Sequence, residues 1–380
     1  MWVMCGMTRR KIGILIGGSG LIGGYIMHYF KTNASDKVDI RAPNSKKLSI
    51  REPEDIGRYL KTVKPDFIIN AAVAPIDSDA HMAFEINYMG SINLARTAVA
   101  LDIPYVHISS GAAMPSGEDL SERDHLPLSP TLSNYAKSKL MAELTLAHMH
   151  KTEGLDYTMA RLGVVYGEHD HKIQGIQRLL FSIVDKTMPF MLTKKGVMHS
   201  YSNADKLPCF IHYALQHRDE FSGQVYNFVD PEPVKMADLI LTIKSHLHSR
   251  IPREIYIPFP VAKVAKSAMG WIIKNLGRFG VKANMPAEVM FLENFYWTQT
   301  LSVQKLKTTS FPDPDPEATI YTKLPTLIHY YLTRWEHLNL ISNEEIFDHQ
   351  NRAEEFIKSP DILLEKLHKE SSVPSDFLYS

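Results

Sequence analysis

Short apolar runs alternate with amphipathic stretches through the first half of the chain, and this alternation narrows the choice of folds most strongly. The runs are Lys11–Ile16, Val38–Arg41, Asp66–Asn70, Tyr105–Ser110 and Tyr157–Leu162, and the stretches between them are Leu21–Lys31, Pro53–Val63, Ala83–Leu101 and Asn134–Thr152. The runs predict strands buried on both faces of a sheet, and the stretches predict the helices that cover it. Because such crossovers are right-handed, we expect an α/β fold with a doubly wound parallel sheet.

A glycine-rich loop joins the first predicted strand to the first predicted helix, with the sequence Gly17-Gly18-Ser19-Gly20-Leu21-Ile22-Gly23. Its glycines permit a tight turn, a close approach of the backbone to a pyrophosphate, and close packing of the helix on the strand. The amino end of the helix then offers free N–H groups and the positive end of its dipole. An ordinary glycine turn is the alternative, but the position between strand and helix favours a Rossmann-type dinucleotide site that includes Ser19, Leu21 and Ile22.

The end of the second predicted strand bears on which dinucleotide is bound. Asp39 lies inside this strand, Arg41 ends it, and a basic loop that includes Lys46 and Lys47 follows. An acidic residue here binds ribose hydroxyls, whereas an arginine accommodates a 2′-phosphate. We therefore expect NADP(H) rather than NAD(H), with Arg41 as the phosphate contact. A solvated basic loop, or Asp39 on the ribose, is the alternative.

Tyr135 and Lys139 are four positions apart in a predicted helix and therefore share one face, whereas Lys137 points elsewhere. A phenol is a poor acid–base group at neutral pH unless its pKa falls, and a neighbouring ammonium lowers that pKa. Ser110 ends a predicted strand, at the edge where α/β sheets bind ligands. We expect Tyr135 to transfer a proton while Ser110 holds a substrate oxygen.

In their order and spacing these motifs resemble the extended short-chain dehydrogenase/reductase family, which includes nucleotide-sugar epimerases, dehydratases and reductases and 3β-hydroxysteroid dehydrogenase-like enzymes. The resemblance spans roughly residues 11–340 and also rests on Asn70-Ala71-Ala72, on 87–94, on 161–167 and on 225–228. It implies that Tyr135 is the catalytic acid/base, that Lys139 lowers its pKa and binds the ribose, that Ser110 orients a carbonyl, and that Asn87 supports the site. It also implies a homodimer and further cofactor contacts from Ser49, Ile50, Asn70, Ala71, Ala72 and Leu162.

Several positions depart from the pattern of that family. Ala113-Met114-Pro115 replaces the usual Val-Tyr-Gly after Ser110, Ser49 replaces an aspartate near the adenine, and Leu162 replaces a proline. Ala204-Asp205 keeps one acid of a usual pair. Dehydratases of the family place Asp-Glu after the active-site hydroxyl, where this chain has Gly111-Ala112. The proton-transfer residues are all retained, so carbonyl reduction or alcohol oxidation is favoured, with epimerisation as the alternative.

Composition restricts the partners of the chain. Lysine plus arginine and aspartate plus glutamate are equal at 42 each, which gives no field for nucleic acid. Cys5 and Cys209 are the two cysteines, and they favour a reducing cytoplasm without a disulfide framework or a zinc site. The apolar run after Arg10 is typical of a strand rather than a secretion signal, and we expect no transmembrane helix.

The motifs divide the chain into an expected dinucleotide-binding domain at 1–165, whose core also takes segments up to about 230, a smaller substrate-binding part at 166–340, and a charged helical tail at 341–380. In the second part, helices are expected at Ile173–Asp185, Lys206–His217 and Met236–Ser249, a strand at Gln224–Val229, and a turn at Phe311–Pro316, where three prolines exclude a regular helix.

Two segments of this part bear on the substrate. Glu168–His171 is interpreted as a solvated loop rather than a metal site, and His199–Asn203 as pocket lining or a plain loop. Pro258–Ala283 has one apolar face with lysines mostly off it. That face either packs on the second domain, covers an apolar substrate as a lid, or touches a membrane surface. The substrate is expected to be a carbonyl or alcohol compound, either lipid-like or a nucleotide-sugar, and a non-catalytic NADP-binding regulator is the alternative function.

Overall fold

The computed structural model describes residues 9–173, 175–184, 190–191, 196–247, 253–254, 258–278, 295–341, 356–362 and 364–365. The predicted tail at 341–380 is described only at residues 341, 356–362 and 364–365, and its other residues lie outside this description. The same holds for the ends of two predicted helices, at Asp185 and beyond Leu247, and for the segment after Arg278.

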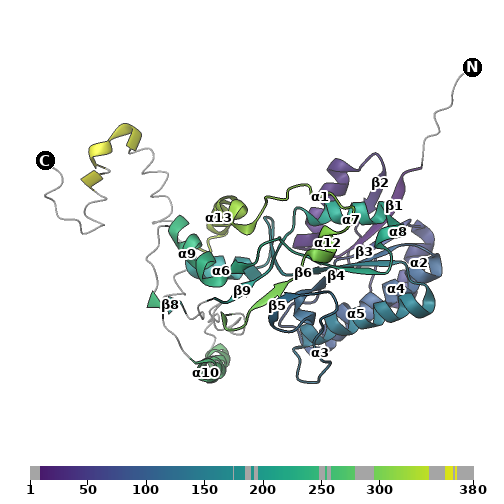
Figure 1. The fold of residues 1–380 in the computed structure, drawn as a ribbon, viewed down its shortest axis with the longest axis horizontal. Coiled ribbons are helices and arrows are strands. Elements are labelled where there is room, and N and C mark those ends of the chain that lie inside the picture. Colours follow the sequence, from purple (N-terminus) through teal and green to yellow (C-terminus); the bar gives the residue numbers. More distant parts are fainter. Residues whose placement is uncertain are drawn as a thin grey trace, which may run out of the picture.

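A six-stranded parallel sheet forms the centre of the first part (Figure 1), in the order β2-β1-β3-β4-β6-β11. Its strands are β1 (Lys11–Ile16), β2 (Val38–Arg41), β3 (Phe67–Asn70), β4 (Tyr105–Ser110), β6 (Tyr157–Leu162) and β11 (Gln224–Phe228). All five pairings are parallel. The predicted α/β class with a doubly wound parallel sheet is confirmed, and the last strand comes from far along the chain.

Helices cover both faces of this sheet (Figure 1). One face packs against α1 (Leu21–Asn33), α7 (Leu207–Gln216) and α8 (Arg218–Phe221), and the other against α2 (Pro53–Val63), α4 (Gly90–Leu101) and α5 (Asn134–Glu153). Each face has its own apolar core, with Phe30 and Phe210 fully buried on the first and Ile56 and Leu146 on the second. Both faces of the sheet are therefore packed mainly with apolar side chains.

Local sequence sets the ends of these helices. Pro53 occupies the first turn of α2, where its missing N–H is tolerated, and acidic residues follow it. The Ser133 side chain caps α5 by accepting a hydrogen bond from the Ala136 N–H at 3.2 Å, and α5 ends at Gly154, whose φ is +72°. The Ser133 cap fixes where α5 starts, and therefore where its first turn places Tyr135.

The predicted helix Ala83–Leu101 is interrupted in the structure. A short helix α3 (Ala80–Met82) leads into a π-helical segment η1 (Ala83–Met89), and α4 follows from Gly90. A π-turn holds one more residue per turn than an α-helix, often beside functional sites. Periodicity did not predict this feature, because the apolar pattern of the segment is compatible with either helix.

The second part has a separate core formed by α6 (Gly175–Val184), α9 (Met236–His246) and α13 (Ile320–His337) (Figure 1). A small sheet in the order β12-β9-β14-β5 adjoins it, made of β5 (Gly117–Leu120), β9 (Met198–His199), β12 (Val234–Lys235) and β14 (Gln299–Leu301). Strand β7 (Val164–Tyr166) pairs with β10 (Tyr201–Asn203), and β8 (Phe190–Met191) pairs with β13 (Arg253–Glu254). Further helices of the described residues include η2 (Gly111–Ala113), α10 (Phe259–Arg278) and α12 (Gln304–Lys307). Residues 311–316 form no helix or strand, as predicted.

Candidate active site

The glycine loop lies at the carboxyl edge of the sheet, between β1 and β3, where the strand order reverses. Open α/β sheets bind ligands at this point. Gly17 has a φ of +86°, and a Cβ there would lie 2.6 Å from the Ala71 backbone. A Cβ on Gly23 would lie 2.1 Å from the Gly17 carbonyl oxygen. These glycines are therefore required by the packing of the loop against β3 and of α1 against the loop.

The first turn of α1 has no side-chain cap, and Gly20 occupies the N-cap position. The nearest atom to a Cβ on Gly20 is 3.5 Å away, so the loop surface is open at this residue. Leu21, Ile22 and Gly23 occupy the first three helical positions, whose N–H groups have no partner within a helix. An uncapped amino terminus at the switch point of the sheet fits the pyrophosphate of a dinucleotide.

Asn70 forms the end of β3 and is buried beneath this loop. Its Nδ2 donates to Ser91 Oγ at 3.1 Å and to Tyr105 Oη at 2.9 Å, while its Oδ1 accepts from the Ala72 N–H at 3.1 Å. The amide is therefore used within the protein, where it fixes the course of Ala71 and Ala72. The structure places Asn70 as a support of the predicted cofactor surface.

The residues predicted near the adenine end lie on two neighbouring segments. Arg41 ends β2 and pairs with Asp39, with Nη2 to Oδ2 at 2.7 Å, and both side chains are exposed at the rim. Ser49 is partly buried, and the Ile50 side chain packs on Gly90. The Ile50 carbonyl accepts from Asn93 Nδ2 at 3.2 Å, which ties this loop to α4.

Ser110 and Tyr135 come together at the carboxyl end of β4. The Ser110 side chain accepts from the Ala112 N–H at 3.2 Å and lies near enough to the phenol of Tyr135 to affect its pKa. Burial raises the pKa of Tyr135, and the interaction with Ser110 opposes this rise. The prediction that the Tyr135 pKa would be lowered is wrong for this structure, because desolvation outweighs the interaction with Ser110. A protonated phenol at neutral pH is suited to donate a proton.

Lys139 lies one helical turn further along α5 and is 3% exposed. Its Nζ donates to the Ile108 carbonyl at 2.9 Å. Burial lowers the pKa of Lys139 to about 8, and the Glu143 carboxylate opposes the shift. His107, fully buried in β4, has its pKa lowered well below the ordinary value, by burial first and by the Lys139 charge second. The Lys139 ammonium is therefore held at the Ile108 carbonyl of β4, one helical turn from Tyr135, and the nearby His107 is neutral.

Asn87 connects two sides of the site from within the π-helical segment η1. Its Oδ1 accepts from the Ala74 N–H at 2.8 Å, and its Nδ2 donates to Ser138 Oγ at 3.1 Å. Ser138 Oγ donates in turn to the Tyr135 carbonyl at 2.9 Å. Asn87 therefore joins the loop after β3 to the turn of α5 that holds Tyr135.

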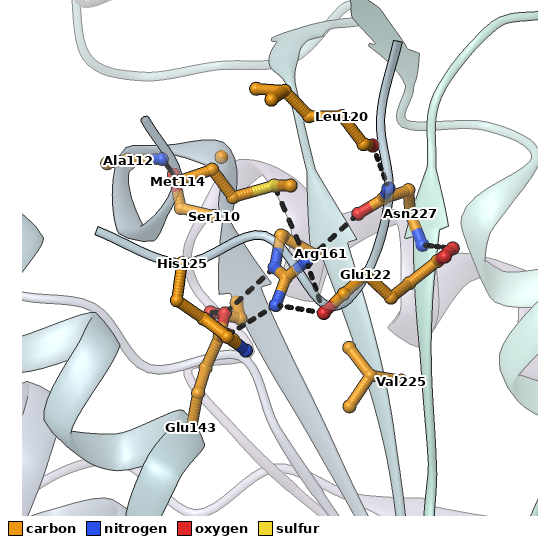
Figure 2. Close-up of polar contacts among 12 residues, drawn as sticks. Ser110, Ala112, Met114, Leu120, Glu122, His125, Glu143, Arg161, Val225 and Asn227 are labelled. Atoms are coloured by element: carbon orange, nitrogen blue, oxygen red, sulfur yellow. Dashed lines mark hydrogen bonds and ion pairs between the residues drawn. The ribbon is translucent and has the colours of Figure 1, made fainter. Parts of the chain in front are cut away.

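Arg161 and Glu143 form a buried ion pair near the Ser110 loop (Figure 2). The sequence analysis did not identify this ion pair as part of the site. Arg161 Nη2 lies 2.6 Å from Glu143 Oε2, and the two side chains are 0% and 2% exposed. Ser109 Oγ donates to Glu143, and Arg161 also donates to Asn227 Oδ1 at 3.2 Å. The pair therefore ties β4, α5, β6 and β11 together beneath the reacting groups. The position of Glu143, one turn beyond Lys139 on the same helix face, is the sequence signal that could have indicated it.

Gln299 is a second residue that the sequence analysis missed. Its side chain reaches from β14 to the loop after Ser110, where Nε2 lies 3.0 Å from the Gly111 carbonyl, 3.1 Å from that of Met114 and 3.0 Å from that of Pro115. One amide therefore fixes the turn that carries Ser110. No local motif marks this residue, because 188 positions separate it from Gly111.

Other predicted residues lie around this centre. Leu162 ends β6 between Ser110 and Phe228 in the sheet and is 4% exposed. The segment His199–Asn203 is neither a loop nor an open pocket wall, because its residues are buried and mostly belong to β9 and β10. Ser202 Oγ within it donates to the Phe228 carbonyl at 2.6 Å.

The Glu168–His171 loop, interpreted from the sequence as a solvated loop rather than a metal site, contacts α13. His169 Nδ1 lies 3.1 Å from Tyr330 Oη, and Arg334 Nη2 lies 2.8 Å from His171 Nδ1. Within the described ranges, no three histidine, cysteine, aspartate or glutamate side chains are grouped to hold a metal ion. No helix in the part of the chain that the structure describes is long and apolar enough to cross a membrane.

Comparison with known proteins places the chain in an enzyme family. A sequence model of the NAD dependent epimerase/dehydratase family matches residues 14–228. The chain therefore belongs to the NAD dependent epimerase/dehydratase family, and the resemblance to extended short-chain dehydrogenases/reductases is confirmed. It is an enzyme of the class that uses a nicotinamide dinucleotide.

Individual relatives are distant. An N-acetyl-alpha-D-glucosaminyl-diphospho-ditrans,octacis-undecaprenol 4-epimerase of Escherichia coli O157:H7 is 22% identical over 275 residues, which are 70% of this chain and 81% of that protein. The UDP-glucose 4-epimerase of Thermus thermophilus in complex with NAD has a TM-score of 0.60 at 18% identity, covering 84% of this chain and 99% of that one. A dTDP-4-dehydrorhamnose reductase of Bacillus anthracis in complex with NADP has a TM-score of 0.60 at 15% identity, with coverage of 84% and 99%. The two structures show the shared fold.

Proposed function

We propose that this enzyme transfers a hydride between NADP(H) and a carbonyl or hydroxyl carbon of a sugar that is linked to a diphosphate. The observation that carries this proposal is the interaction of Ser110 with the protonated phenol of Tyr135, one helical turn from the buried Lys139 ammonium. The glycine loop at the switch point between β1 and β3 fits the dinucleotide. The names of the three relatives, each of which acts on a sugar diphosphate, support the substrate class.

The chemistry follows from these three side chains. Ser110 hydrogen-bonds the substrate oxygen and orients it toward Tyr135. Tyr135 donates its proton to that oxygen, and the negative charge left on the phenolate is stabilised by Lys139 one turn away. The nicotinamide, when bound, supplies or accepts the hydride. Burial of the ammonium and partial burial of Tyr135 lower the local dielectric constant, which strengthens the electrostatic effect of Lys139 on the phenolate.

Simple oxidoreduction is favoured over dehydration by the residues after Ser110. The turn η2 is Gly111-Ala112-Ala113, which offers no carboxylate for the elimination of water. Epimerisation is the second candidate, because the relative from Escherichia coli is a 4-epimerase and the chain covers most of its length.

The preference for NADP(H) rests on Arg41. Its guanidinium lies at the carboxyl end of β2, next to the first β–α loop, and is partly exposed beside Asp39. A charge-assisted bond from arginine to the 2′-phosphate is worth about 2 kcal/mol, or roughly thirtyfold in affinity. Arg41→Ala is expected to weaken NADPH binding by about this factor and to leave NADH binding nearly unchanged. An equal loss for both dinucleotides would contradict the assignment.

A homodimer through the outer surface of η1 and α5 is also proposed. Phe84 is 50% and Leu144 44% exposed on this surface. Phe84 contacts the Tyr88 ring at 5.9 Å, and Tyr88 Oη lies 3.3 Å from Thr145 Oγ1, so one surface includes both helices. The double variant Phe84→Glu/Leu144→Glu is expected to be monomeric by light scattering. A wild-type chain that is monomeric at micromolar concentration would refute the dimer.

Tyr135→Phe tests the reaction directly. The variant keeps the ring and its packing but removes the proton, so turnover of NADPH with keto-sugar diphosphates should fall by roughly 10²–10⁴-fold. Tyr88→Phe, which also removes one phenolic oxygen from a neighbouring helix, is the matched control and should retain activity. Sugar stereochemistry that changes without net NADPH consumption would establish epimerisation instead. Unchanged turnover in Tyr135→Phe would overturn the mechanism, and dinucleotide binding without turnover of any carbonyl would favour a regulatory protein.

A further inference from the structure

The helix α10 (Phe259–Arg278) exposes its apolar face instead of burying it. Val264 and Trp271 are each 70% exposed, Val261 is 58% exposed and Ile272 is 49% exposed. Their spacing places all four on one face of the helix, together with the exposed Ala268. The interpretation of this face as packed on the second domain is therefore wrong.

The first turn of α10 attaches the helix to the second part of the molecule. Ala262 is buried in the core of that part, and the ring of Phe259 packs against Tyr296 at 5.3 Å and Trp297 at 5.7 Å. Figure 1 shows α10 at the margin of the molecule, away from the central sheet. A firm attachment with the opposite face exposed fixes the orientation of the apolar side chains.

The charge of this helix is entirely of one sign. Lys263, Lys266, Lys274 and Arg278 lie within it, and no aspartate or glutamate does, although the whole chain has equal numbers of acidic and basic residues. By helical spacing, Lys263 lies next to the Trp271 edge of the exposed apolar face, whereas Lys266 lies on the same side as Ala262 and Phe259. An exposed apolar face with tryptophan, next to an exposed lysine on a helix without acidic residues, is the arrangement of a helix that lies in a lipid interface.

We propose that α10 binds the surface of an anionic lipid bilayer, with Trp271 and Val264 among the acyl-chain ends and Lys263 among the phosphates. The charge of the helix complements this surface. A second copy of the chain fits less well, because an isologous contact through the same face would bring the basic residues of two helices together. The binding adds an interaction surface to the proposed catalytic function and does not depend on it.

Flotation of the full chain with lipid vesicles tests this proposal. Vesicles of phosphatidylcholine containing phosphatidylglycerol should carry the protein, and vesicles of phosphatidylcholine alone should carry far less. Each unit of positive charge near an anionic surface favours binding by about the same free energy, and Lys263→Glu changes the charge by two units. The variant should therefore lower the partition coefficient by roughly thirtyfold. Lys151→Glu, an equal charge change at an exposed position of α5, is the control and should have little effect.

The apolar contribution has its own variants. Val264→Ser/Trp271→Ser should abolish flotation, whereas Leu338→Ser, at a residue that is 54% exposed elsewhere, should not. Because all these side chains are exposed, the variants should keep the thermal midpoint and the dinucleotide affinity of the wild type. Three results would overturn the proposal: no flotation with anionic vesicles, equal flotation of the apolar double variant, or lipid-free self-association that this double variant abolishes.

Discussion

Lys139→Met is predicted to stabilise the protein while removing most of its activity. The Lys139 side chain is 3% exposed, and burial lowers its pKa from 10.5 to about 8. Such a shift means that the charged form costs about 3 kcal/mol more in the folded than in the unfolded chain at neutral pH. Methionine has a similar shape and no charge, so Lys139→Met removes this cost. The lost hydrogen bond to Ile108 offsets about 1 kcal/mol of the gain.

The pH dependence distinguishes this effect from ordinary packing. The folded pKa of Lys139 lies below its unfolded value, so the unfolded chain binds more protons between pH 8 and pH 10.5. The free energy of unfolding of the wild type should therefore rise, relative to the variant, as the pH rises through this window. The advantage of Lys139→Met should be largest at pH 7 and should shrink by about 2 kcal/mol at pH 10.

Urea denaturation at these two pH values, without dinucleotide, measures both quantities, and NADPH turnover measures activity. Activity should fall by roughly 10²–10⁴-fold, because the phenolate of Tyr135 loses its stabilising charge. Lys137→Met, near the start of the same helix, is the matched control and should alter neither property much. A variant that is less stable than the wild type at pH 7, or a stability difference that does not change with pH, would refute the reasoning.

Three further predictions concern the supports of the site. Gln299→Leu should lower kcat about tenfold or more and leave the dissociation constant of NADPH unchanged. The reason is that Gln299 fixes the Ser110 turn and lies apart from the glycine loop. A loss confined to NADPH binding would refute this role. Arg161→Met should destabilise the chain by about 3–5 kcal/mol in urea denaturation, because it leaves the buried Glu143 carboxylate without its partner. Adding Glu143→Leu should recover much of this loss. Additive losses in the double variant would contradict the prediction. Gly17→Ala should abolish NADPH binding in titration calorimetry, since its Cβ would meet the Ala71 backbone; wild-type affinity would exclude this geometry.

The sequence predicted the central sheet well because its strands are buried on both faces. The run Lys11–Ile16 shows no polar alternation after its first residue, and the structure gives it the predicted bounds. The bounds of Val38–Arg41 and Tyr157–Leu162 also agree with the prediction. The strands of the second part are shorter, two or three residues in the case of β9 and β10, and carry no comparable pattern. They form because the fold pairs them, which the local sequence does not show.

The residues of the candidate site likewise fall into those that local sequence predicts and those that depend on tertiary contacts. Ser110, Tyr135 and Lys139 follow from local rules, the end of a strand and a helical spacing of four. Gln299 and Arg161 depend on tertiary contacts and could not be found in this way. The raised pKa of Tyr135 was missed for the same reason, because it depends on the desolvation of the phenol by residues that are distant in the sequence.

The exposed face of α10 shows a further limit of the sequence. An apolar stripe on a helix has the same pattern whether it packs on a core or faces outward. Only the structure shows that Ala262 and Phe259 pack inward while Val264 and Trp271 do not.

A crystal structure of the full chain with NADP⁺ tests the central claim most directly. The account predicts the pyrophosphate against the amino end of α1, between Gly17 and Gly23, and the nicotinamide ring beside the phenolic oxygen of Tyr135. A dinucleotide bound at another place, or a nicotinamide ring far from Tyr135, would contradict it.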